Sequence, residues 1–129
     1  MRLLLDTHIW IWSVTEPRRL SSRVRRELQN PLSERWLSPI SLWEALLLHS
    51  KGRIQLPFGL TELTERATAQ FREAPITHEI AVAAHALELT HRDPADRFLA
   101  ATAQVLGLTL VTADERLLGL ATVACLANR

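Results

Sequence analysis

The chain has 129 residues, enough for one domain with a full hydrophobic core. With 47% hydrophobic residues it is not a disordered chain, yet no apolar run approaches the roughly 18–20 residues that a membrane-crossing helix needs. The net charge of +1 excludes a global attraction to nucleic acid, so any binding of a polyanion must depend on local patches. We therefore expect a single domain over residues 1–129.

The cysteine content and the start of the chain bear on its location. Cys125 is the only cysteine, which excludes an internal disulfide and is typical of a reducing compartment. The start, from Met1 to Asp6, is too short and turns acidic too soon for a signal peptide. We expect a cytoplasmic protein.

The first stretch of the chain predicts a buried strand. Three consecutive leucines, Leu3–Leu5, run directly into Asp6. An apolar run without alternation is typical of a strand in a parallel sheet, which is covered on both faces. Asp6 therefore falls at the carboxyl end of the strand, and ligands of open α/β sheets bind at that edge.

Apolar spacing, start residues and stop residues predict the remaining elements. Ser41 and Glu44 have the spacing of a capping box, and Asp93 with Pro94 suits the start of a later helix. We expect helices at residues 8–16, 21–30, 41–52, 60–74, 78–89, 94–106 and 114–118, and strands at 35–38, 75–77, 108–112 and 123–126. This alternation favours an α/β three-layer sandwich with a central, mostly parallel sheet of four to five strands.

Four acidic residues fall where this topology has its carboxyl edge: Asp6, Glu44, Asp96 and Asp114. Four carboxylates in one crevice repel one another, which raises the pKa of some of them and destabilises the fold. A hard divalent cation removes that repulsion, because Mg²⁺ and Mn²⁺ prefer oxygen ligands and bridge to phosphate oxygens. Such a site lowers the pKa of bound water and suits hydrolysis of a phosphodiester.

A structural explanation exists for each acid taken alone. Acids are favoured in the first turn of a helix by the helix dipole and by capping, whether or not a metal binds. Glu44 completes a capping box with Ser41, and Asp6 and Asp114 can each cap the helix that follows. The placement of all four at one edge is what favours a site.

Four segments resemble the PIN-domain family: Leu3–His8, Ser41–Glu44, Asp93–Ala103 and Leu110–Asp114. The resemblance covers nearly the whole chain, and its most specific part is the Asp93-Pro-Ala-Asp-Arg97 segment. Length and spacing are similar to those of the VapC-type toxins of toxin–antitoxin systems.

The resemblance implies a Mg²⁺- or Mn²⁺-dependent endoribonuclease that is a homodimer and is inhibited by a small antitoxin protein. By position, Asp6, Glu44 and Asp96 match the central acids of the family and Asp114 its more variable fourth. Thr112 matches a hydroxyl residue two positions before that fourth acid. The sequence departs from the family pattern at none of the acids.

The chemistry suggests a role for each residue, as a hypothesis. Asp6 and Asp96 are the closest metal ligands, either directly or through water, and Asp114 adds charge for a first or a second ion. Glu44 orients or deprotonates the attacking water. Asp93 is interpreted as a helix cap because Pro94 follows it. Thr7 and Ser41 either hold waters or cap their helices. For Arg97 three roles stay open: clamping an acid, meeting substrate phosphate, or a surface ion pair.

Aromatic and basic residues add a weaker prediction. Three tryptophans near the acids either line a groove for an antitoxin peptide or RNA bases, or pack in the core: Trp10, Trp12 and Trp43. Five arginines either track an RNA backbone or form a solvated helix face: Arg18, Arg19, Arg23, Arg25 and Arg26. The five histidines show no zinc spacing.

Two other classes of phosphate chemistry fit the sequence less well. A phosphoacceptor receiver domain needs a lysine after its last strands, whereas the only lysine in this sequence is Lys51, which lies in a different region. A phosphatase of the haloacid dehalogenase type needs Asp-x-Asp after the first strand, where this chain has Asp6-Thr-His8. A non-catalytic PIN-type binding module and a DNA-directed nuclease remain as alternatives, since metal–carboxylate sites cleave either polymer.

Overall fold

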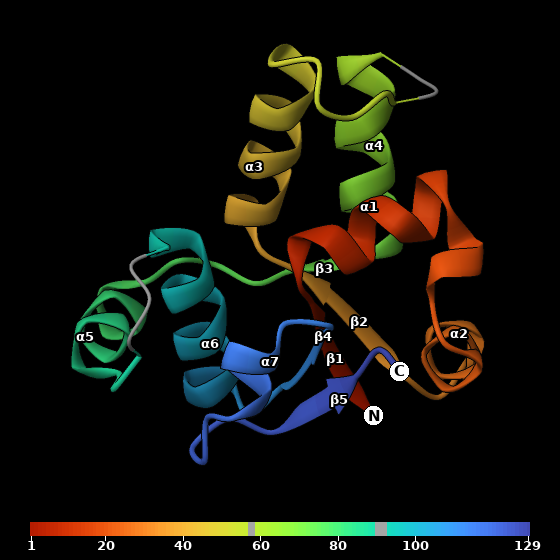
Figure 1. The fold of residues 1–129 in the computed structure, drawn as a ribbon. Coiled ribbons are helices and arrows are strands. Elements are labelled where there is room, and N and C mark those ends of the chain that lie inside the picture. Colours follow the sequence, from red (N-terminus) through yellow and green to blue (C-terminus); the bar gives the residue numbers. More distant parts are fainter. Residues whose placement is uncertain (57–58, 90–92) are drawn as a thin grey trace.

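The computed structural model describes residues 1–56, 59–89 and 93–129 (Figure 1). Within these residues, five strands form one sheet in the order β3-β2-β1-β4-β5, and every neighbouring pair is parallel. The strands are β1 (Arg2–Leu5), β2 (Glu34–Leu37), β3 (Arg72–Glu73), β4 (Thr109–Thr112) and β5 (Cys125–Ala127). The α/β fold with a central parallel sheet is confirmed.

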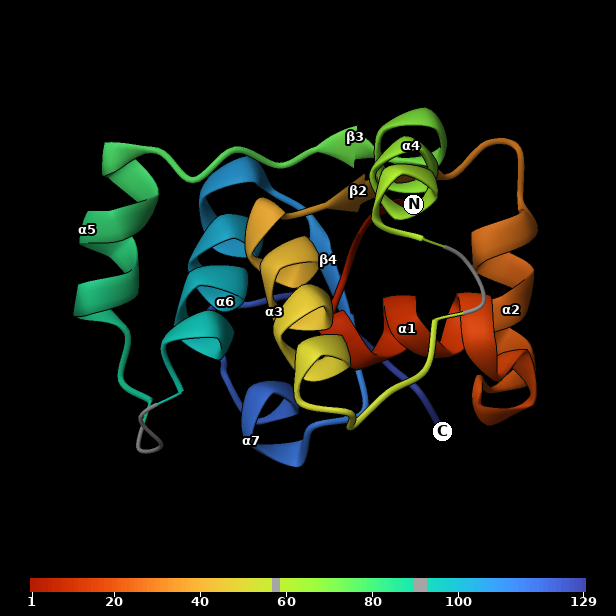
Figure 2. The ribbon, with the colours of Figure 1, turned by 90° about the horizontal axis from the view of Figure 1, so that it is seen from above.

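Helices cover both faces of this sheet (Figures 1 and 2). They are α1 (Thr7–Thr15), α2 (Ser22–Gln29), α3 (Pro39–Ser50), α4 (Leu60–Gln70), α5 (His78–Ala86), α6 (Pro94–Leu106) and α7 (Glu115–Leu118), with a 3₁₀ turn, η1, at Pro17–Arg19. No helix in the described ranges combines the length and the apolar character needed to cross a lipid bilayer.

The central strand β1 explains why its sequence does not alternate. Leu3 and Leu5 point into a core shared with α1, α2 and α4, whereas Leu4 points into a second core shared with α6 and α7. All three leucines are fully buried. A side chain of this size contributes roughly 1.5–3 kcal/mol when it leaves water, so the run of three leucines stabilises both layers at once.

Two predicted elements between α4 and α5 are wrong. The helix expected at 60–74 ends at Gln70, and the chain then forms β3, in which Arg72 pairs with Trp36. The strand expected at 75–77 is absent from this described segment. An edge strand of two residues is too short to show a period, and the buried Ala74 continues the apolar spacing of the preceding helix.

The predicted start of α3 is also wrong. The side chain of Ser38, not of Ser41, caps this helix by accepting a hydrogen bond from the backbone N–H of Ile40 at 3.1 Å, and Pro39 occupies the first helical position. Ser41 lies inside the helix and is fully buried. Glu44 is therefore in the second turn and forms no capping box, which leaves its carboxylate available for other contacts.

Both ends of α6 agree with the sequence prediction, whereas the end of α5 and the start of β5 do not. Asp93 caps α6, and Gly107 ends it with φ at +66°, a left-handed conformation that glycine adopts without strain. In contrast, α5 ends at Ala86 rather than at residue 89, and the last strand begins at Cys125 rather than at residue 123. The start of α6 matters most here, because it brings acidic residues to the carboxyl edge of the sheet.

Candidate active site

Asp6 lies where β1 ends and α1 begins. Leu5 pairs with Val111 of β4, and the backbone N–H of Asp6 donates to the Val111 carbonyl at 3.0 Å, so the ends of the two central strands are level. The Asp6 carboxylate accepts a hydrogen bond from the backbone N–H of Thr7 at 2.7 Å and acts as the cap of α1. This side chain is therefore held at the carboxyl edge.

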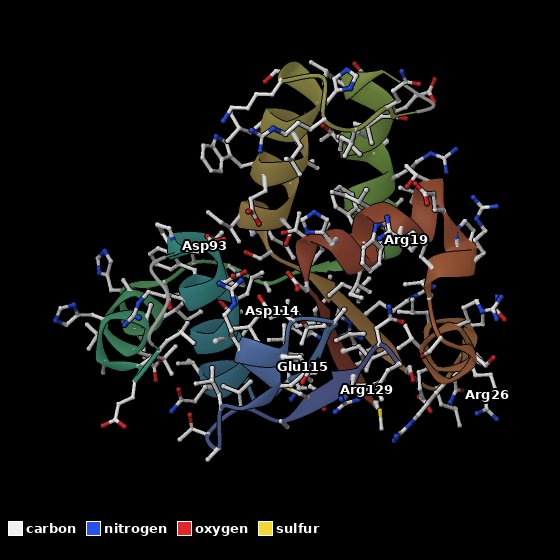
Figure 3. All side chains as sticks on the ribbon, in the orientation of Figure 1. Arg19, Arg26, Asp93, Asp114, Glu115 and Arg129 are labelled. Atoms are coloured by element: carbon white, nitrogen blue, oxygen red, sulfur yellow. The ribbon has the colours of Figure 1, made fainter. Side chains whose placement is uncertain are left out.

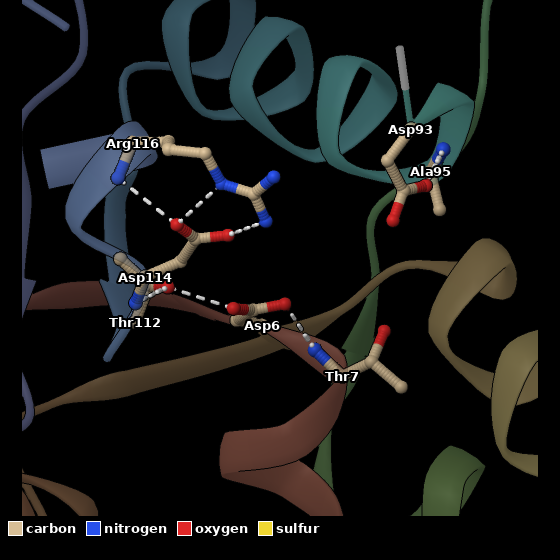
Figure 4. Close-up of polar contacts among 7 residues, drawn as sticks. All are labelled: Asp6, Thr7, Asp93, Ala95, Thr112, Asp114 and Arg116. Atoms are coloured by element: carbon tan, nitrogen blue, oxygen red, sulfur yellow. Dashed lines mark hydrogen bonds and ion pairs between the residues drawn. The ribbon is translucent and has the colours of Figure 1, made fainter. Parts of the chain in front are cut away.

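A hydroxyl group from β4 holds the other oxygen of Asp6. Thr112 donates a hydrogen bond of 2.7 Å to it and accepts one of 3.0 Å from the backbone N–H of Asp114 (Figure 4). Burial nevertheless raises the pKa of Asp6, and the two hydrogen bonds from Thr112 and Thr7 offset only part of that effect. The pKa of the Asp6 carboxyl thus stays above its ordinary value.

Asp96 projects from the first turn of α6 and is 9% exposed. Its pKa is raised to about 7, first because burial disfavours the charged form and then because other carboxylates repel its negative charge. The repelling groups are Asp93, Asp6, Asp114 and Glu44. Acids from four separate elements and from the cap of α6 therefore act on one another at this position.

Glu44 reaches the same edge from α3. The Thr7 hydroxyl donates a hydrogen bond to its carboxylate and lies 3.0 Å from the hydroxyl of Ser41. Burial raises the pKa of Glu44, with a smaller contribution from the negative charges of Asp93 and Asp6. Thr7 thus connects the start of α1 with the buried side of α3 and orients the Glu44 carboxylate.

Asp114 follows β4 and caps the short helix α7. One of its oxygens accepts from the backbone N–H of Arg116 at 2.9 Å. The guanidinium of Arg116 also pairs with both carboxylate oxygens, at 3.1 Å from Nε and 3.0 Å from Nη2. Figure 4 shows these two side chains facing one another above Asp6.

These side chains line one pocket of about 310 Å³. Its lining includes the four predicted acids, Asp6, Glu44, Asp96 and Asp114. Asp93, Thr7, His8 and Trp12 also line it. In Figure 3, the labelled Asp93 and Asp114 lie between α6, α7 and α1, whereas Arg26 and Arg129 lie away from them. The structure therefore brings together the acids that the sequence placed at one edge.

The donor chemistry of the pocket fits a hard divalent cation. Its polar lining consists mainly of carboxylates, and the raised pKa of Asp96 reflects negative charge that a cation would neutralise. Among the described residues, no three Asp, Glu, His or Cys side chains already converge closely enough to hold one ion. Because Mg²⁺ keeps several waters and needs only one or two direct carboxylates, this open arrangement is compatible with it.

The three roles left open for Arg97 are wrong. Its guanidinium points away from the acids and donates to four backbone carbonyls at and after the end of α5: those of Ala84, His85, Leu87 and Leu89, at 2.8–3.3 Å. The last carbonyls of a helix lack partners within the helix. Arg97 therefore joins the end of α5 to α6 and has a structural role.

The three tryptophans and five arginines considered in the sequence analysis do not form one surface. They lie in the core, at the pocket or in solvent. Trp10 is buried in the core, Trp43 is 56% exposed, and only Trp12 lines the pocket. Of the five arginines of the cluster, Arg19 lies over the Trp12 ring, at 4.1 Å from its centroid. The arginines of α2 are exposed and lie on a solvated helix face.

Two basic residues of the described lining were not expected from the sequence as site residues: His8 and Arg116. His8 is exposed, and its ring centroid lies 5.9 Å from that of Trp12. Arg116 stands two positions after Asp114, at the start of a helix too short to show a period. A signal for it was available in the capping geometry, because the residue two after an Asp cap donates its N–H to that cap and so lies beside it.

The chain is similar to known proteins in both sequence and structure. Residues 3–123 match the PIN domain. The chain is 35% identical over 116 residues to Ribonuclease VapC22 of Mycobacterium tuberculosis, covering 89% of this chain and 88% of that protein.

Among solved structures, a toxin–antitoxin complex from Klebsiella pneumoniae has a chain with a TM-score of 0.71 and 23% identity, covering 98% of both chains. FitAcB from Neisseria gonorrhoeae has a chain with a TM-score of 0.68 and 26% identity, covering 98% of this chain and 97% of that one. This chain thus shares its fold with both structures over nearly its whole length.

Proposed function

The chain belongs to the PIN-domain family, and we propose that it is a metal-dependent endoribonuclease, the toxin of a VapBC-type toxin–antitoxin pair. One observation carries the proposal: carboxylates from β1, α3, α6 and the end of β4 line a single pocket. Helix capping alone does not require four carboxylates to line the same pocket. The proposal treats residues 1–129 as one nuclease domain.

Three carboxylates are proposed to hold Mg²⁺ or Mn²⁺, directly or through waters bound to the ion: Asp6, Asp96 and Asp114. When bound, such an ion stabilises negative charge developing on a phosphodiester and lowers the pKa of a bound water. Asp6 suits this role because Thr112 and the backbone N–H of Thr7 hold its carboxylate in one orientation. Ligands that are already oriented lose less freedom when the ion binds.

Glu44 is the proposed general base. Its carboxylate is half-buried, faces the pocket and is oriented by the Thr7 hydroxyl. In this role it accepts a proton from the attacking water while the water oxygen forms a bond to phosphorus and the ribose oxygen leaves. A raised pKa makes a carboxylate a stronger base, so the burial of Glu44 favours proton transfer at neutral pH.

Substrate and partners are proposed from the relatives. The name of the 35% identical protein is that of a ribonuclease, and the 23% identical structure is called a toxin–antitoxin complex. We accordingly assign RNA as the substrate, a small antitoxin protein as the inhibitor, a homodimer as the assembly and the cytoplasm as the location. A DNA-directed nuclease and a PIN-fold binding module without catalysis are the competing functions.

The test compares RNA and DNA cleavage by the purified, partner-free chain with and without Mg²⁺ or Mn²⁺. Asp6→Asn removes a proposed ligand charge at nearly constant shape, and Glu44→Gln removes the base. Glu115→Gln is the matched control, because Glu115 is exposed and pairs with Arg129 outside the pocket. We expect RNA cleavage that requires the metal and is lost in both pocket variants but not in the control.

Other results separate the alternatives. Cleavage of DNA alone supports the DNA-directed nuclease. Absence of cleavage for both polymers, together with RNA binding that Asp6→Asn leaves unchanged, supports the binding module. Metal-dependent cleavage that persists in Asp6→Asn contradicts the assignment of this pocket.

A further inference from the structure

Arg116 places a cation inside the acidic pocket. Its Nε and Nη2 lie 3.1 and 3.0 Å from the two oxygens of Asp114, a two-point pairing that suits the planar guanidinium (Figure 4). The guanidinium lies close enough to Asp96 and Asp93 for their charges, added to the hydrogen bond from Asp114, to raise the pKa of Arg116. Arg116 therefore interacts with Asp114, Asp96 and Asp93.

The described lining of the pocket holds one guanidinium beside several carboxylates. Within the described part of the chain, Arg116 is the only arginine or lysine that lines the pocket, where it stands against five carboxylates. The other basic residue of the described lining is His8.

Capping of α7 does not require the Arg116 side chain. The backbone N–H of Arg116 already satisfies Asp114 as the helix cap, at 2.9 Å. The guanidinium pairs with the same carboxylate, and its side chain is 59% exposed. An ion pair of this exposure is weak and exchanges readily, which is the behaviour expected of a counter-ion that another cation can displace.

From this geometry we infer that Arg116 competes with the divalent cation for Asp114 and lowers the affinity of the pocket for metal. The inference rests on the proposed function, since it takes Asp114 as a metal ligand. Two cations cannot occupy the same carboxylate lone pairs, and positive charge beside the site opposes entry of a second positive charge. Arg116 is thus a positioning residue that holds Asp114 until metal displaces it.

The experiment measures metal binding directly, without substrate. Mn²⁺ and Mg²⁺ are titrated into the metal-free full-length chain by calorimetry, and Mn²⁺ binding is followed in parallel by electron paramagnetic resonance. Arg116→Gln removes the competing charge. We expect it to bind both ions roughly two- to fivefold more tightly than the wild type, the range that follows from the strength of an exposed ion pair.

Two further variants separate a specific pairing from a general charge effect. Arg129→Gln removes an exposed arginine that pairs with the neighbouring Glu115, and its metal affinity is expected to equal that of the wild type. Arg116→Lys keeps the charge but loses the two-point pairing. Its affinity is expected to fall between those of the wild type and Arg116→Gln.

Several outcomes overturn the inference. Unchanged or weaker metal binding in Arg116→Gln does so while leaving the proposed nuclease function intact, provided that the wild type binds metal. An equal gain in Arg129→Gln assigns the effect to net charge, and an Arg116→Lys affinity equal to that of the wild type excludes the two-point pairing. If neither the wild type nor Arg116→Gln binds metal, the inference and the metal-dependent function both fail.

Discussion

The hydroxyl of Thr112 donates a hydrogen bond of 2.7 Å to Asp6, although the two residues are 106 positions apart in the chain. Parallel pairing of β1 with β4 brings them together, because Leu5 and Val111 are partners in the register. The same hydroxyl oxygen accepts from the backbone N–H of Asp114. One small side chain therefore positions two of the proposed metal ligands.

Replacement of Thr112 tests this positioning. Thr112→Val keeps the shape of the side chain but removes the donor, so the pKa of Asp6 rises further above its ordinary value. We expect kcat/KM for RNA to fall about tenfold near neutral pH, in line with the loss of a hydrogen bond to a charged group. The loss should become smaller as pH rises, because a further increase in the pKa of Asp6 favours its protonated form more at lower pH.

The control for this prediction is Thr109→Val, the same change at the opposite end of β4. It should leave the pH–rate profile unchanged. A Thr112→Val profile that is lower by the same factor at every pH would contradict a role exerted through Asp6.

The raised pKa of Asp96 predicts that stability of the metal-free protein depends on pH. The folded protein holds this proton up to about pH 7, whereas the unfolded chain releases it near the ordinary carboxyl pKa of about 4. Between these values the native state binds more protons, so the free energy of unfolding falls as pH rises from about 4 to about 7. This loss is complete above pH 7.

Asp96→Asn removes the titrating group and should flatten that slope. We expect the variant to be more stable than the wild type by at least about 1 kcal/mol at pH 8 in the presence of a chelator, because one pKa unit corresponds to about 1.4 kcal/mol. Urea denaturation at pH 5 and pH 8 measures both differences. A slope equal to that of the wild type would mean that other groups carry the pH dependence.

Addition of metal should reverse the instability that the carboxylates cause. At a free concentration one hundred times the dissociation constant, Mg²⁺ or Mn²⁺ stabilises the folded chain by about 2.7 kcal/mol. The rise in melting temperature should be larger at pH 8 than at pH 6, because protons compete with the ion at Asp96 below about pH 7.

Chelation should return the melting temperature to its original value. Sodium chloride at the same ionic strength serves as the control for screening of the carboxylates. An equal rise with sodium chloride, or an undiminished rise in Asp96→Asn, would exclude a specific metal site at this residue.

Arg97 is predicted to affect stability rather than catalysis. Arg97→Lys leaves several carbonyls around the end of α5 without their donor. The expected loss is roughly 2–3 kcal/mol in the free energy of unfolding, with kcat/KM unchanged for the fraction that is folded. Arg25→Lys, on the exposed side of α2, is the matched control. A fall in kcat/KM without loss of stability would restore a role at the site.

Local chemistry was enough to predict several features from sequence alone. Three leucines followed by Asp6 predict a buried central strand with a carboxylate at its end, because among strands only one covered on both faces accepts such a run. Asp93 and Gly107 mark the ends of α6 through their capping preferences. Parallel topology then places the acids at one edge, since the carboxyl ends of all strands lie there.

Other features depend on contacts between segments that are distant in sequence, and only the tertiary structure decided them. Ser41 and Glu44 had the spacing of a capping box, yet packing of α3 against α1 turned them toward Thr7. Arg97 could face the acids or α5, and only the position of α5 decided between them. A local pattern records the preferences of neighbouring residues, whereas the direction of a long polar side chain depends on which partners the fold brings within its reach.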